Sequence, residues 1–173
     1  MLATNRLVTT SLFIACGLLL PMLFHSFGLG GKTFLPMHIP VLMGGLLLGW
    51  LPGLLIGILT PLLSCFLTGM PQLLPSLPMM LAELPLYGAV TGYLYHSKGK
   101  NIYLSLISAM LLGRLGAGIV LMLFADLLGI SLPPLVYVAT TIATGMVGII
   151  IQLSFIPLLV TRLKKIITAE VLQ

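Results

Sequence analysis

Apolar runs separated by short segments rich in glycine, proline or charge divide the chain into six stretches. Most of these runs approach the length of about 20 residues that a helix needs to cross a bilayer. We therefore expect a single domain over residues 1–173 with six transmembrane helices, at about 7–27, 37–49, 52–68, 79–95, 102–128 and 135–160. The second run, of about 13 residues, is too short to span the membrane without tilting or thinning it.

The composition fits this pattern, because 59% of the residues are hydrophobic, only 6% are charged and the mean hydropathy is +1.21. A soluble domain carries roughly 25% charged residues to cover its surface. Most of the outer surface must therefore face lipid, and we predict an all-α integral membrane protein that has the lipid bilayer as a partner.

The basic residues indicate an orientation. The net charge is +5, but the basic side chains lie at the ends of apolar runs and form no patch for nucleic acid. With six spans, both termini and the loops after the second and fourth helices share one side. That side has Arg6, Lys98, Lys100, Arg162, Lys164 and Lys165, whereas the other side has only Lys32. The positive-inside rule then places both termini in the cytoplasm.

Two charged residues lie inside apolar runs, where charge is costly and marks a functional candidate. Arg114 lies about twelve residues into the fifth helix, roughly 18 Å from its cytoplasmic end, and Glu83 lies roughly 6 Å from the outer end of the fourth. The two could therefore meet in the outer half of the bundle. They form either an ion pair that only joins two helices or part of a polar ligand site.

Further polar residues favour the ligand site. His38 stands at the outer start of the second helix, and Tyr87 lies one turn from Glu83 on the same helical face. We expect His38, Glu83, Tyr87 and Arg114 to line a substrate pocket. Gln152 lies deeper, in the sixth helix, as a packing or lining residue.

Several classes of chemistry are not indicated. The sequence has no HExxH, no GxSxG and no phosphate-binding loop, so we predict neither an enzyme nor ATP hydrolysis in this chain. Cys16 and Cys65 lie inside apolar runs without CxxC spacing. We therefore expect no metal site and no cofactor.

Small residues recur at four-residue spacing, which lets helix backbones approach closely within a membrane. They either pack inside the bundle or form a surface for another membrane protein. The pairs that we consider for such a surface are Ser11 with Ala15 and Gly45 with Gly49.

Three stretches resemble a known family. They are Pro-Met-His-Ile-Pro-Val-Leu at 36–42, Thr-Gly-Met-Pro at 68–71 and Ala-Glu-Leu at 82–84 followed by Tyr87-Gly88. In these stretches, and in its size and helix number, the chain is similar to the substrate-binding S components of energy-coupling-factor (ECF) transporters.

The resemblance implies a subunit of the prokaryotic plasma membrane that binds a vitamin or similar micronutrient on the outer side. It implies three partners, a transmembrane coupling protein and two ATPase subunits, and a gate formed by the glycine-rich loop at 28–35. In this family the first helix docks on the coupling protein through Ala-x-x-x-Ala. The matching positions here are Ser11 and Ala15, so serine replaces the first alanine.

The candidate site residues suit two classes of substrate. Arg114 and His38 suit a ligand with a carboxylate, such as pantothenate, niacin or folate, because arginine binds such groups bidentately. A neutral pyridoxine or a pyrimidine would suit Glu83 and Tyr87 better. The alternative functions are a stand-alone secondary carrier or channel for a small solute and, last, an intramembrane scaffold or enzyme.

Overall fold

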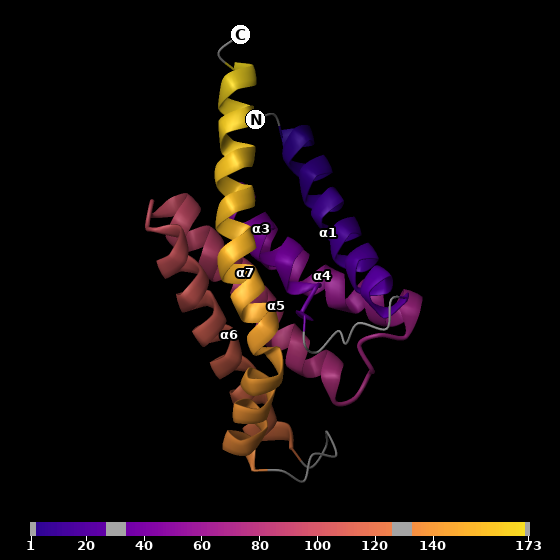
Figure 1. Cartoon of the computed structure of the whole chain (residues 1–173). Helices are drawn as coiled ribbons and strands as arrows, with labels where there is room; N and C mark the ends of the chain where they lie inside the picture. The colour runs from indigo at the N-terminus through magenta and orange to yellow at the C-terminus, as the bar shows by residue number, and fades with distance from the viewer. Residues whose placement is uncertain (1–2, 27–33, 126–132, 172–173) are drawn as a thin grey trace.

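The computed structural model describes residues 3–26, 34–125 and 133–171, and every regular element in these ranges is a helix (Figure 1). This confirms the all-α prediction for the described part of the chain. The elements in chain order are α1 (Ala3–Ser26), α3 (His38–Leu48), α4 (Trp50–Thr68), α5 (Ser76–Thr91), the π-helical turn η1 (Gly92–Ser97), α6 (Ile102–Phe124) and α7 (Pro134–Val171).

Within the described ranges, four helical segments are long and apolar enough to cross a membrane, namely Thr4–Phe24, Trp50–Thr68, Ile102–Phe124 and Ala139–Lys164. Helix α3 has only 11 residues and is roughly 16 Å long, about half the thickness of the hydrocarbon core. Helix α5 continues directly into η1, so the two together run from Ser76 to Ser97.

Helix α1 begins at Ala3, before its expected start near residue 7, and α5 and α7 also extend beyond their expected bounds. Helix α5 begins at Ser76 because Pro78, in its first turn, lacks only an N–H that would have no partner there. Helix α7 continues to Val171, beyond the expected end near residue 160. The apolar pattern ends where Arg162 and Lys164 begin, but no glycine or proline follows them to stop the helix.

A single glycine separates α3 from α4. Gly49 has a φ of +99°, a conformation that favours glycine, and its N–H donates to the carbonyl of Gly45 at 2.9 Å. A Cβ at this position would also lie 3.1 Å from Cδ2 of His96 and 3.2 Å from Nη2 of Arg6. Gly49 thus allows the chain to reverse without a longer loop.

Glycines also let α4 approach α5. A Cβ on Gly53 or Gly45 would collide with the Gly88 carbonyl, and a Cβ on Gly57 would collide with the backbone of Leu84. These close approaches identify most of the four-residue glycine series as internal packing, which membrane helices need because lipid gives them little hydrophobic drive to associate.

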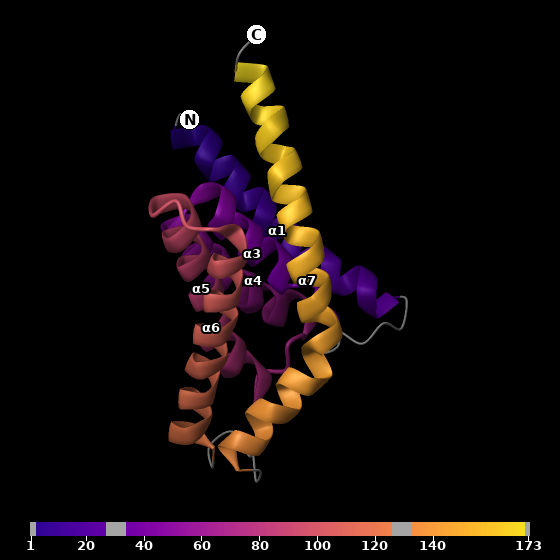
Figure 2. The same ribbon diagram turned by 60° about the vertical axis from the view of Figure 1, so that its left-hand side comes forward.

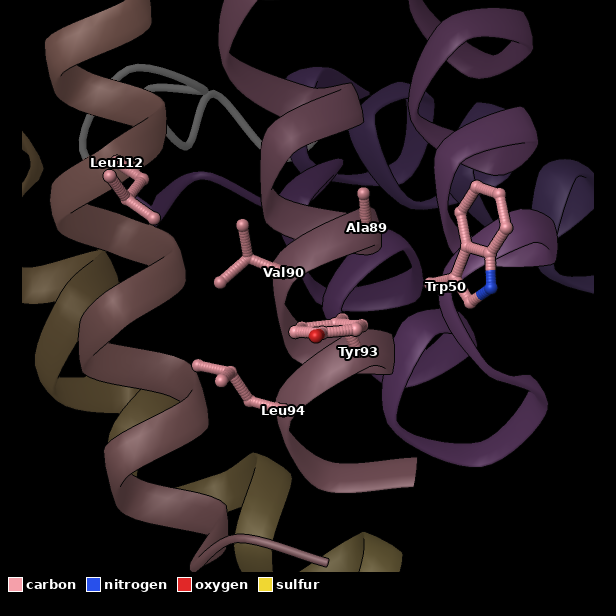
Figure 3. Close-up of a pocket in the computed structure, with 6 residues that line it drawn as sticks. All are labelled: Trp50, Ala89, Val90, Tyr93, Leu94 and Leu112. Carbon is pink, nitrogen blue, oxygen red and sulfur yellow. The ribbon is translucent and has the colours of Figure 1, made fainter. Parts of the chain in front are cut away.

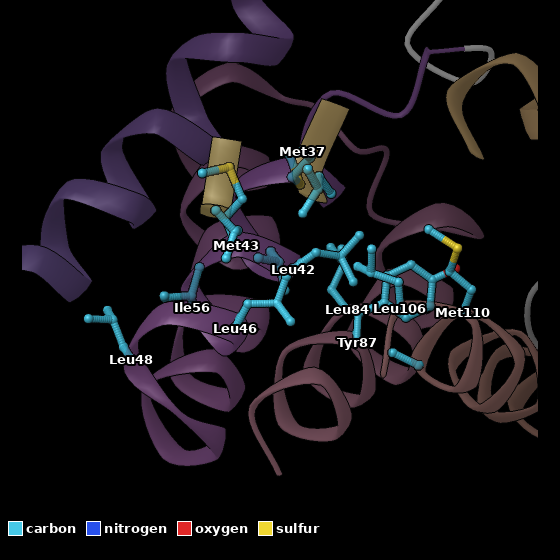
Figure 4. Packing of buried hydrophobic residues seen from close by; sticks show 14 residues of the cluster. Met37, Leu42, Met43, Leu46, Leu48, Ile56, Leu84, Tyr87, Leu106 and Met110 are labelled. Carbon is cyan, nitrogen blue, oxygen red and sulfur yellow. The ribbon is translucent and has the colours of Figure 1, made fainter. Parts of the chain in front are cut away.

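The core surrounds α3, in which every residue except Ile39 and Leu47 is buried. Val41, Leu42 and Leu46 have no exposed surface. Figure 4 shows the core residues of α3 gathered with those of α4, α5 and α6, and Ile156 and Val160 of α7 complete the cluster. Since α3 is short and central, its first residue, His38, lies inside the bundle.

The start of α1, the end of α7 and the turn between η1 and α6 lie at one end of the bundle (Figures 1 and 2). Helices α3 and α5 both run toward this end, because His38 lies beside Glu83 at their starts and Gly49 lies beside His96 at their ends. The first turn of α3 and the first half of α5 are therefore both placed away from it, and these are the segments that contain His38 and Glu83.

Candidate functional site

The Glu83 carboxylate is the centre of a buried polar cluster. Its Oε1 atom lies 3.1 Å from Nε of Arg114 and 3.8 Å from Nε2 of His38. The same oxygen accepts a hydrogen bond of 2.6 Å from the Tyr87 hydroxyl. All four residues that the sequence analysis selected are thus brought together, from α3, α5 and α6.

These side chains are almost fully removed from the surface. His38 is 2% exposed, Glu83 6% and Tyr87 1%, and the Arg114 side chain is 13% exposed. A buried charge is tolerated only when it is paired and hydrogen-bonded. The Glu83–Arg114 ion pair and the Tyr87 hydroxyl provide that compensation for the carboxylate.

The local sequence makes room for this arrangement. Glu83 and Tyr87 are one turn apart on α5, so they share a face. The ring of Tyr87 fits against Gly113 of α6, where a Cβ would collide with it. On its other side, Tyr87 meets the His38 ring edge-on, with centroids 5.4 Å apart and an interplanar angle of 62°. Gly113 therefore makes room for the Tyr87 ring. Because Arg114 directly follows Gly113 on α6, the same close packing keeps Arg114 near the cluster.

Several hydrogen-bonding atoms in the cluster are not used within the described residues. Both ring nitrogens of His38 are buried without a hydrogen bond, and so are Nε and Nη2 of Arg114. The contact from Arg114 to Glu83 is an ion pair whose geometry is not that of a hydrogen bond. An unmade buried hydrogen bond costs about 1–3 kcal/mol. The Arg114 nitrogens are donors, and a neutral His38 ring has one donor and one acceptor, so a ligand with polar atoms could satisfy these groups.

Helix α7 and the segment before α3 close the cluster beside Arg114. Nε2 of Gln152 donates to the Leu35 carbonyl at 3.4 Å, while its Oε1 is buried without a hydrogen bond. A Cβ on Gly145 would lie 3.1 Å from Leu35 Cδ1 and 3.4 Å from Arg114 Nη2. Sequence reasoning had Gln152 as a packing or lining residue and missed Leu35 and Gly145.

Leu35 also connects the cluster to the loop expected to act as a gate. It has a φ of 51°, which is uncommon for a residue other than glycine, and its carbonyl accepts from the His38 N–H at 3.1 Å. Residues 28–33 of the expected gate lie outside the described residues. The ring of Phe34, just after them, packs against Phe24 of α1 in a tilted arrangement, with ring centroids 5.6 Å apart and an interplanar angle of 55°.

The structure separates the two pairs of small residues expected to form a docking strip. Ser11 and Ala15 are exposed on α1. Gly45 and Gly49 are buried within the bundle, Gly45 against Gly88. Of the two pairs, only Ser11 and Ala15 are therefore accessible to another protein, because other parts of this chain cover Gly45 and Gly49.

No group of three or more His, Cys, Asp or Glu side chains that could hold a metal ion occurs in the described ranges. Cys16 and Cys65 are both free cysteines.

The fold and the cluster define a helical membrane protein with a buried polar site between its helices. Residues 5–160 match the family described as ECF transporter, substrate-specific component. The chain belongs to this family and is the substrate-specific subunit of an ECF transporter. No curated protein and no solved structure matched the chain.

Membership of the family has direct consequences. Its members are substrate-binding membrane subunits rather than enzymes. They take a small-molecule substrate and have the other subunits of the ECF module as partners. The buried cluster around Glu83 thus occurs in a protein whose task is to bind a small molecule in the membrane.

Proposed function

We propose that this subunit captures a vitamin or similar micronutrient at the cluster of His38, Glu83, Tyr87 and Arg114, for import driven by ATP hydrolysis in partner subunits. One observation supports this most strongly. A carboxylate paired with Arg114 lies in the core among donors that make no hydrogen bonds within the described residues. A purely structural ion pair would not need further unused donors from a third helix.

The unused atoms favour a ligand that accepts hydrogen bonds. Two buried donor nitrogens of Arg114 lack hydrogen bonds, and a neutral His38 ring adds one donor and one acceptor, against one acceptor oxygen of Gln152 in the same region. Because guanidinium groups bind carboxylates strongly, we expect the ligand to bear a carboxylate, as pantothenate, niacin and folate do. Glu83 and Tyr87 would then orient Arg114 and contact a hydroxyl or amine of the ligand.

The proposed orientation puts both termini in the cytoplasm. Most basic residues belong to the segments at the end of the bundle that has the termini (Figure 1), as the positive-inside rule requires of a cytoplasmic end. The Glu83 cluster, in the half away from that end, would face the outside. The protein would thus be a multi-pass protein of a prokaryotic plasma membrane that loads its substrate from outside the cell.

The coupling protein is proposed to dock on α1. Ser11 and Ala15 lie on an exposed face of this helix, whose large neighbours are also exposed: Leu7 is 71% exposed, Leu12 61% and Leu19 57%. Two small residues one turn apart allow a partner helix to approach closely. Two ATPase subunits would supply the energy, since the sequence has no phosphate-binding loop.

Uptake and binding assays together test the proposal. The purified subunit should bind one of the candidate vitamins without partners, and cells should accumulate that vitamin only when the coupling protein and ATPases are coexpressed. Accumulation by cells that lack both partners would instead support a stand-alone carrier. A subunit that binds none of the vitamins would contradict the proposed site.

A further inference from the structure

A second recess lies on the surface of the bundle, apart from the Glu83 cluster. It is an apolar groove of about 410 Å³ between the start of α4, the α5–η1 junction and α6, lined by Trp50, Ala89, Val90, Tyr93, Leu94 and Leu112 (Figure 3). Leu112 forms one side and Trp50 the other, with Ala89, Val90 and Tyr93 between them (Figure 3). The volume is within the range of small-molecule sites, about 300–1,000 Å³.

The groove faces away from the polar cluster. Leu112 is 46% exposed, whereas the next residue on α6, Gly113, packs on the ring of Tyr87. The groove is also distinct from the proposed docking face, because α1 packs on α3 and α4 rather than on α6. The groove is therefore a surface feature separate from both the polar cluster and the proposed docking face.

Positive charge lies at one end of the groove. The Lys98 ammonium is 5.4 Å from the centroid of the Tyr93 ring, and Tyr93 lines the groove. Lys98 and Lys100 are both exposed, and the segment 92–103 contains no acidic residue. A ligand that fits the apolar groove can thus reach Lys98 with an anionic end.

Aromatic side chains lie at the same end. Trp50 and Tyr93 are each 49% exposed, and Tyr103, at the start of α6, is 51% exposed. Half-exposed tryptophan and tyrosine are typical of the membrane–water interface. The apolar groove matches the acyl chains of a lipid, the half-exposed aromatic side chains match its glycerol region, and the lysine matches its phosphate.

We propose that the groove is a binding site for an anionic phospholipid, with an acyl chain along Val90 and Leu112 and the phosphate at Lys98. In the orientation proposed above, this end faces the cytoplasmic leaflet, whose anionic lipids attract juxtamembrane lysines. The lipid would contact α5 and α6, the helices that contain Glu83 and Arg114.

Native mass spectrometry of the full chain in detergent tests the site. Palmitoyl-oleoyl phosphatidylglycerol is titrated against phosphatidylcholine with the same chains, and the phosphatidylglycerol should bind more tightly. Lys98→Gln should weaken phosphatidylglycerol binding about fivefold, the effect of one lysine near a membrane surface, and leave phosphatidylcholine unchanged. Lys98→Arg, which keeps the charge, should retain the preference.

A matched pair of variants on α6 tests the groove itself. Leu112→Trp fills it and should weaken the binding of both lipids, whereas Leu111→Trp, at a 62% exposed neighbour outside the groove, should not. Equal binding of the two lipids by the unmodified protein, or equal effects of the two tryptophans, would overturn the proposal. Glycerol 3-phosphate binding as tightly as the lipid would overturn it too, because the site would then be one for a free anion.

Discussion

The Tyr87 hydroxyl donates a hydrogen bond of 2.6 Å to Oε1 of Glu83, one turn earlier on α5. Both groups are buried, so this bond fixes the carboxylate oxygen that also faces Arg114 and His38. Tyr87→Phe removes the hydroxyl and keeps the ring that packs on Gly113 and His38. We expect this variant to lose about 1.5–3 kcal/mol of stability or ligand affinity, as for a bond to a charged group. Thermal unfolding and ligand titration measure the two quantities, and no change in either would show that the bond is dispensable.

A single and a double variant distinguish a structural role of the Glu83–Arg114 ion pair from a role in substrate binding. Glu83→Gln alone leaves Arg114 without its counter-charge and should cost about 3–5 kcal/mol of stability. The double variant Glu83→Gln/Arg114→Met leaves no buried charge and should recover much of that loss. It should nevertheless fail to bind substrate. Restored stability together with normal binding would assign the pair a structural role only.

Glycine packing between α4 and α5 predicts a clear difference between two alanine variants. In Gly53→Ala, the new methyl group meets the rigid backbone of Gly88, so the helices must separate. In Gly116→Ala, the methyl group meets mainly the flexible end of the Leu86 side chain, which can move, and lies 3.3 Å from the Ala82 carbonyl oxygen, so only a small backbone adjustment is needed. We expect Gly53→Ala to lower the melting temperature in detergent and Gly116→Ala to change it little. Similar melting temperatures for the two would argue against close α4–α5 packing.

The docking face on α1 predicts that assembly and binding can be uncoupled. Ala15→Trp adds a large side chain to an exposed position on α1, which packs on α3 and α4 rather than on the Glu83 helix α5, so vitamin binding by the purified subunit should persist. Uptake by cells with the full complex should fail, because the coupling protein can no longer approach. Ile107→Trp, at a 46% exposed position on α6, is the control and should transport normally. Loss of vitamin binding in Ala15→Trp would mean that this face packs inside the bundle.

His96, at the end of η1, predicts a dependence of stability on pH. Partial burial, with the positive charges of Arg6 and Lys164, holds the pKa of this imidazole below its ordinary value of 6.5. The unfolded chain therefore takes up the proton first, and the free energy of unfolding should fall as the pH drops below about 6.5. In thermal unfolding between about pH 7.5 and about pH 5.5, His96→Gln should show a smaller decrease than the unmodified chain. An equal decrease would exclude His96 as the source.

The meeting of Glu83 with Arg114 could be predicted from the sequence for a physical reason. Each lies in an apolar run, and a charge in a bilayer needs a partner. Tyr87 followed from its helical spacing, and His38 from its position at the outer start of α3. What the spacing could not give was the burial of nearly all of α3, which depends on how five other segments pack around it.

Other features depended on contacts between distant segments. Gln152 donates to the carbonyl of Leu35, 117 positions away, and no local pattern indicates that pairing. The glycine series had two interpretations, and only the position of Gly88 shows that Gly45 and Gly53 pack inside the bundle. The length of α7 was underestimated because a hydropathy pattern marks where the apolar span ends rather than where the helix ends.

The central claim is that the cluster around Glu83 and Arg114 binds the transported molecule. Mass spectrometry of small molecules released from the gently purified subunit tests it most directly, with Arg114→Lys as the comparison because lysine keeps the charge and loses the planar fork of arginine. We predict that one small carboxylate-bearing vitamin is released from the unmodified protein and that it is strongly reduced in the variant at equal melting temperature. Equal amounts released from both proteins would contradict the claim.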